Sequence, residues 1–177
     1  TGEVPSFVHE TLLVDHLAAV WDGADALHAR STFLDKLPLY RAARGATFVH
    51  DLHEAVADGA DPGPDELDTR HRDLLEEFKG PVELGEHAGA GWLEIDLARE
   101  PYHAYRYATG SVGALSLVRA LREGELTAEE YREMLSRGRN VPSNEAFQPA
   151  LDFTDEATVE RGIDAYADRV EGLLDAL

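Results

Sequence analysis

Phenol and imidazole side chains gather at short spacing in the middle of the chain. Tyr102, His103, Tyr105 and Tyr107 lie within six positions of one another. A phenol hydroxyl can donate a hydrogen bond to a developing oxyanion, and Tyr102 and Tyr105 are about one helical turn apart, so both could reach one atom. The alternative is aromatic packing in the core with the hydroxyls at the surface. Catalytic or substrate-binding phenols and core aromatics both remain possible on this pattern.

The element that must position these side chains is a helix rich in small residues. From Ala108 onward the sequence reads Ala-Thr-Gly-Ser-Val-Gly-Ala-Leu-Ser-Leu. Glycine within a helix lowers the stability of that helix, and close packing against a neighbour can offset this loss. We therefore expect a central, buried helix that neighbouring helices approach closely.

Nucleophilic and nucleotide-dependent chemistry has little support in the sequence. It contains no cysteine, no GxSxG, no P-loop and no GxGxxG. Ser111 and Ser116 lie within the small-residue stretch. They are best explained as packing residues whose hydroxyls bond back to the carbonyl four positions earlier.

A second cluster could bind a metal ion. His50, His53 and Glu54 stand at positions i, i+3 and i+4, which share one helix face and could chelate zinc. The simpler interpretation is a half-buried histidine beside a solvated acidic face. An independent metal-binding helical protein is thus one of three functional hypotheses.

Apolar residues repeat at three and four positions through most of the chain, and no strand pattern of comparable length occurs. The start and stop signals predict helices from about Pro5 to Trp21, from Pro38 to Gly59, from Pro64 to Gly80, from Thr127 to Gly138, from Val141 to Pro149 and from Thr154 to Leu177. Three glycines between Gly85 and Gly91 predict a loose loop. The fold class is all-α, a bundle of about six to eight helices forming a single helical domain over residues 1–177.

Charge is the strongest compositional signal. The chain has 35 acidic and 16 basic residues, a formal net charge of −19, and only two lysines, Lys36 and Lys79. Repulsion from phosphates disfavours nucleic acid and anionic membranes as partners. An acidic surface with so few lysines is typical of a halophilic source.

No run of 18 apolar residues and no cysteine occur, which favours a cytoplasmic protein.

Several segments together resemble one enzyme family. They are Glu3-Val-Pro-Ser followed by Glu10, the stretch FVHDLHEAVADG from Phe48, Phe78-Lys-Gly, YHAYRYATG from Tyr102, and Ser136-Arg-Gly with Pro142 and Ala150-Leu-Asp. The chain resembles, over nearly its whole length, the C-terminal part of the thimet oligopeptidase and oligoendopeptidase F family of zinc peptidases. The tyrosine-rich segment is the most specific match.

This resemblance implies a function and a set of roles. It implies hydrolysis of short peptides, with Glu3 as a zinc ligand and with Tyr102 and Tyr105 binding substrate or stabilising the oxyanion. His103 and Tyr107 would also line the substrate site. The sequence has no HExxH, which in the family supplies two zinc ligands and the general base. We therefore expect a C-terminal fragment of a catalytic domain that is inactive and cannot hold zinc alone.

The sequence also departs from the family next to the tyrosines. A family histidine would align near Asp96 or Leu97, and the segment from Trp92 to Ala98 has none. The remaining hypothesis is a non-catalytic helical relic that binds a peptide or a protein partner. If the chain is a fragment, the faces of the first helix and of the tyrosine-bearing helix should be apolar yet exposed, and a missing N-terminal half or self-association would cover them.

Overall fold

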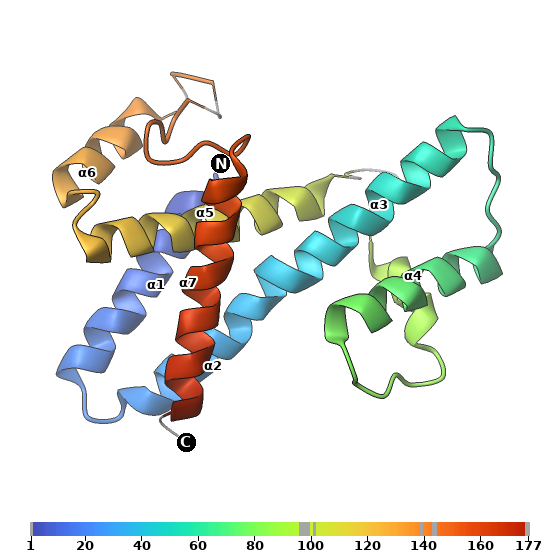
Figure 1. Ribbon diagram of the computed structural model, residues 1–177, viewed down its shortest axis with the longest axis horizontal. Coiled ribbons are helices and arrows are strands. Elements are labelled where there is room, and N and C mark those ends of the chain that lie inside the picture. Colours follow the sequence, from blue (N-terminus) through green and yellow to red (C-terminus); the bar gives the residue numbers. More distant parts are fainter. Residues whose placement is uncertain (1, 96–99, 101, 139, 143–144, 176–177) are drawn as a thin grey trace. The chain divides into compact units, whose positions relative to one another are not determined.

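Figure 1 shows a computed structural model of the chain. It describes residues 2–95, 100, 102–138, 140–142 and 145–175, with the side chains of residues 33–38 left out. Over these residues the secondary structure consists of seven α-helices, one π-helical turn and one 3-10 helix, without a strand. The predicted all-α fold and helix number are confirmed. None of the described helices is long and apolar enough to cross a membrane.

The helices lie close to their predicted positions. Their bounds are α1 Glu3–Val20, α2 Ala24–Lys36, η1 Leu37–Arg41, α3 Ala42–Ala57, α4 Pro64–Lys79, η2 Ala88–Glu94, α5 His103–Glu123, α6 Ala128–Arg137 and α7 Glu156–Asp175. The helix predicted to begin at Pro38 differs most from its observed counterpart. It joins α2 through the π-helical turn η1, so the run is helical from Ala24 to Ala57.

The chain divides into two compact units. Unit 1 comprises Thr1–Leu39 and Thr109–Leu177, and unit 2 comprises Tyr40–Ala108. The helix α5 contributes its first turns to unit 2 and the rest to unit 1. The single domain expected over residues 1–177 stays a prediction.

Unit 1 is built around the predicted small-residue helix. On α5, residues 110–118 are all buried, which confirms that this segment is central within its unit. A Cβ added at Gly110 would lie 2.7 Å from the Cβ of Glu3, and one added at Gly162 would lie 2.4 Å from the carbonyl oxygen of Val112. Glycines therefore bring α1 and α7 into direct contact with α5. The surrounding core includes Val4, Val8, Leu117, Val118, Tyr131, Met134, Phe147 and Leu151.

Local signals in the sequence set the start of α6. Thr127 accepts a hydrogen bond from the backbone N–H of Glu130, and the Glu130 side chain accepts one from the backbone N–H of Thr127. This is the predicted capping box, which satisfies two backbone donors that the helix leaves free.

The short helix expected from Val141 is wrong for the described part of that stretch, where residues 145–150 form turns. Here two backbone carbonyls accept hydrogen bonds from a side chain. Arg137 Nη1 donates to the carbonyl oxygens of Gln148, at 2.6 Å, and Glu145, at 3.3 Å. Pro149, which has no N–H to donate, adds to this preference for turns.

Unit 2 has a smaller buried centre, formed by Phe48 and Val49 of α3 and His71 and Leu75 of α4. Of the segment from Gly85 to Gly91 expected to be a loose loop, residues 85–87 are loop and turn, but the part from Ala88 onward belongs to the 3-10 helix η2, which packs on α4. A Cβ added at Gly89 would lie 2.6 Å from the carbonyl oxygen of Asp68. Gly89 and Gly91 thus allow close packing of η2 on α4, which the sequence pattern alone could not indicate.

Candidate functional site

Tyr102 occupies the turn that precedes α5 in unit 2. Its side chain is 53% exposed. One face of the phenol ring stacks on the imidazole of His53, with ring centroids 5.5 Å apart and planes inclined by 28°. Tyr102 therefore has one supported face, while more than half of its surface is open to solvent.

Tyr105 lies in the first turn of α5, and 56% of its side chain is exposed. Two phenols that are so accessible do not form the aromatic core that was the alternative to a site. Their exposure suits groups that donate hydrogen bonds to a ligand.

His103 and Tyr107 form a separate pair on α5. Their rings meet edge to face with centroids 5.0 Å apart. The Nδ1 atom of His103 lies 2.5 Å from Oε2 of Glu100, forming an ion pair when the imidazole is protonated. Both residues are half-buried. The polar groups of this pair are thus partly engaged within the unit.

Glu3 stands in the first turn of α1, in unit 1, and is half-buried. Its Cβ faces Gly110 of α5, which also belongs to unit 1, so α1 and α5 approach closely at these two residues. Tyr102 and Tyr105 belong to unit 2. The grouping of Glu3 with these phenols in one site remains a prediction.

The proposed chelating set on α3 is not assembled. His50 Nε2 lies 3.5 Å from Oε1 of Glu54, whereas the ring of His53 stacks on Tyr102. Among the described residues, no three His, Asp or Glu side chains are grouped so that they could hold a metal ion. Zinc sites in proteins use three or four protein ligands. The described residues therefore do not fit a zinc site by themselves, and Glu3 would need ligands from elsewhere.

A polar network fixes η2 against α4 and was not foreseen from the sequence. Trp92 Nε1 donates to Oδ1 of Asp68 at 2.6 Å. The Nδ1 atom of His71 lies 3.3 Å from the carbonyl oxygen of Ala88, and a Cβ added at Gly91 would lie 2.7 Å from the His71 ring. Burial lowers the pKa of His71, and the nearby Arg44 guanidinium lowers it further. Because it is buried, His71 is a packing residue of unit 2 rather than a general base at the surface.

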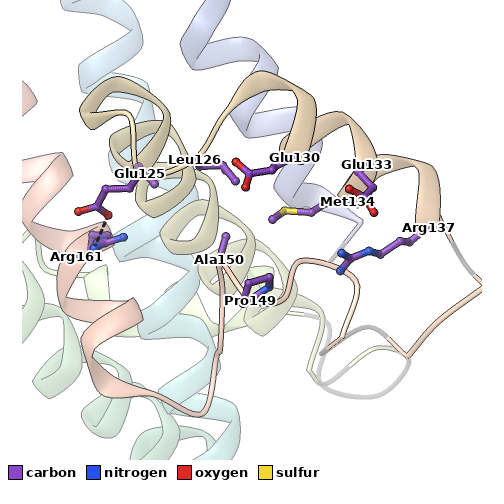
Figure 2. A pocket seen from close by; sticks show the side chains of 10 residues that line it. Glu125, Leu126, Glu130, Glu133, Met134, Arg137, Pro149, Ala150 and Arg161 are labelled. Atoms are coloured by element: carbon purple, nitrogen blue, oxygen red, sulfur yellow. Dashed lines mark ion pairs between the residues drawn. The ribbon is translucent and has the colours of Figure 1, made fainter.

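Unit 1 contains a hollow of about 430 Å³ between α6, the end of α5 and the segment after Gln148 (Figure 2). Apolar lining comes from residues such as Leu126, Met134 and Pro149. Its charged groups largely bind one another or the backbone. Arg161 pairs with Glu125 at 2.9 Å, and Glu130 forms the capping box. This hollow has the volume of a ligand site, but few of its polar groups are free to contact one.

No protein-family model matches the chain. Over 96% of its length, the chain is 25% identical to the oligoendopeptidase F homolog of Borreliella burgdorferi. The chain is homologous to part of oligoendopeptidase F. It spans 30% of the length of that oligoendopeptidase F homolog, which fits the predicted C-terminal portion of a longer peptidase.

A solved structure shares the fold. The crystal structure of a candidate peptidase from Chlamydophila abortus superimposes with a TM-score of 0.88 at 20% sequence identity. The match covers 98% of this chain and 30% of that one. The chain therefore has the same helical arrangement as the matching part of a much longer protein.

Proposed function

We propose that the chain is the helical portion of a zinc oligopeptidase and that it presents phenol hydroxyls to a short peptide substrate. The observation that carries this proposal is the similarity to oligoendopeptidase F over 96% of the chain. The exposure of Tyr102 and Tyr105 supports it, because groups that contact a substrate must be reachable from solvent.

Each proposed role follows from the chemistry of the side chain. The hydroxyls of Tyr102 and Tyr105 donate hydrogen bonds to the substrate or to the oxyanion that develops on its carbonyl. His103 and Tyr107, which contact each other on α5, border the peptide. Glu3 supplies one carboxylate ligand to zinc, together with ligands from an HExxH-bearing portion.

The chain alone is proposed to be inactive. Its described residues do not bring together enough ligands to hold zinc. We place the complete enzyme in the cytoplasm, in keeping with the sequence's lack of cysteine.

A chimera tests this proposal directly. The segment of the Borreliella relative that matches this chain would be replaced by the 177 residues. We expect the chimera to cleave short peptides and to lose this activity when zinc is chelated. Cleavage that persists with chelator, or a folded chimera without cleavage, contradicts the proposal.

Single substitutions in the chimera assign the roles. Tyr105→Phe should lower kcat by about 10²-fold or more, the usual loss on removing an oxyanion donor. Tyr40→Phe is the matched control, because Tyr40 is also an exposed tyrosine of unit 2 but lies outside the cluster. Equal rates for the two variants would remove Tyr105 from the mechanism.

A second candidate function is binding without catalysis, as expected for a relic of a peptidase. The hollow in unit 1 favours it, since its 430 Å³ could admit a peptide side chain or a segment of a partner protein. Peptide binding to this hollow, with no cleavage by the chimera, would support this candidate over the enzyme.

A further inference from the structure

The ring stack between His53 and Tyr102 joins two segments that are 49 residues apart in the sequence. His53 comes from α3 and Tyr102 from the turn before α5, and both belong to unit 2. An inclination of 28° between the planes is close to parallel, and with the centroids 5.5 Å apart the imidazole lies in an offset stack against the phenol. Ring pairs at this separation contribute packing energy beyond the area that they bury.

The backbone around the stack explains why the two rings meet. A Cβ added at Gly45 of α3 would lie 3.4 Å from the Cβ of Ala104 in α5. Val49, four residues further along α3, is fully buried, and His53 follows after another four residues. Residues at this spacing share one helix face. The face of α3 that packs within unit 2 therefore also carries His53.

The neighbouring histidine on α3 has a different partner. His50 pairs with Glu54, one helical turn away on its own helix. The imidazole of His53 is thus the one that reaches the cluster of phenols. An exposed tyrosine without such support would exchange among its staggered rotamers, at an entropic cost on binding.

We propose that His53 is a positioning residue that holds the Tyr102 ring in the orientation in which its hydroxyl meets a peptide. This inference rests on the proposed function, since it assigns to Tyr102 a role in peptide binding. His53 itself does not touch the substrate. Its contribution is to restrict the Tyr102 side chain before the peptide arrives.

Nuclear magnetic resonance on the full chain tests the stack without any ligand. In His53→Ala the ring protons of Tyr102 should lose their ring-current shift and their NOE contacts to α3. His53→Phe should retain both, because a phenyl ring can stack in the same place. His50→Ala, an exposed imidazole on the same helix, should leave the Tyr102 signals unchanged. Unchanged Tyr102 signals in His53→Ala would overturn the proposal.

Titration with a blocked short peptide of alanine, leucine and phenylalanine tests the functional part. The His53→Ala substitution leaves the Tyr102 side chain free to move, and ordering this side chain should weaken peptide binding by about 3- to 10-fold. The His53→Phe substitution should restore binding. If Tyr102→Leu weakens binding but His53→Ala does not, the positioning role is overturned and the proposed function stands. If neither substitution weakens binding, Tyr102 does not contact the peptide, and both proposals lose their support.

Discussion

Unit 1 and unit 2 differ in the kind of contact that stabilises the interior of each unit. In unit 1 two apolar clusters pack around α5, with side chains such as Val8, Leu117 and Leu151 almost completely buried. In unit 2 few apolar side chains are fully buried, and close glycine contacts and polar bonds hold η2 on α4. The exposed phenols belong to unit 2. In keeping with the proposed function, we propose that unit 1 supplies stability and unit 2 supplies recognition.

The largest effect is expected from a cavity in unit 1. Leu117 is 1% exposed, and Leu117→Ala should lower the free energy of unfolding of this unit by about 2–5 kcal/mol, as is usual for a buried leucine. Urea denaturation followed by circular dichroism measures this loss. Leu174→Ala is the control, because Leu174 is 63% exposed, and it should change stability little. Equal losses for the two variants would show that the apolar core does not dominate unit 1.

A buried phenol gives unit 1 a signature at alkaline pH. Burial raises the pKa of Tyr131 to about 12, above its ordinary value near 10. The folded state therefore favours the neutral phenol, and unit 1 should lose about 2–3 kcal/mol as the pH rises from 10 to 12. Absorbance of phenolate should reveal a late-titrating tyrosine that Tyr131→Phe removes. If all tyrosines titrate together while the protein is folded, Tyr131 is not buried as described.

The stability of unit 2 should depend on close packing of its helices more than on the apolar area that they bury. A Cβ at Gly89 would lie 2.6 Å from a backbone oxygen, so Gly89→Ala must displace η2 from α4 and should cost about 1–3 kcal/mol. Gly85→Ala is the matched control in the same segment, because nothing lies within 4 Å of its Cβ. Hydrogen exchange of the η2 amides should increase in the first variant and not in the second. Equal exchange would mean that this contact does not hold η2.

The smallest expected effect concerns mildly acidic pH. The pKa of His71 is lowered, mainly by burial, so the unfolded chain binds a proton more readily than the folded one. Unit 2 should keep its stability above the ordinary histidine pKa of about 6.5 and lose it as the pH falls further. Hydrogen exchange of α4 between neutral and acidic pH measures this, and His71→Leu should weaken the dependence. His16, an exposed histidine of unit 1, provides the control when changed to Gln. The same pH dependence in His71→Leu would contradict this assignment.

Sequence analysis predicted the elements whose signals are local. The capping box at Thr127 and the helix that begins at Pro64 depend on residues within one turn, and both are present. The central position of α5 was also predictable, because a helix with several glycines needs close neighbours. Periodicity and capping therefore account for most of the all-α fold.

The features that escaped prediction depend on contacts between distant segments. The hydrogen bond from Trp92 to Asp68 joins residues 24 positions apart, and the stack of His53 on Tyr102 joins residues 49 positions apart. No local sequence pattern predicts either contact. Glycines that serve a loop and glycines that serve close packing look alike in a sequence, so the loop predicted from Gly85 to Gly91 is wrong from Ala88 onward, where η2 begins. Of the candidate site, the sequence identified the phenols but not the imidazole that supports one of them.

The most direct test of the central claim is to locate peptide binding on the intact 177-residue chain. Amide and aromatic signals would be followed by nuclear magnetic resonance while a blocked short peptide is added. If unit 2 supplies recognition, the shifts should concentrate at Tyr102, Tyr105 and the first turns of α5. Shifts confined to the hollow around Met134 in unit 1 would contradict the account.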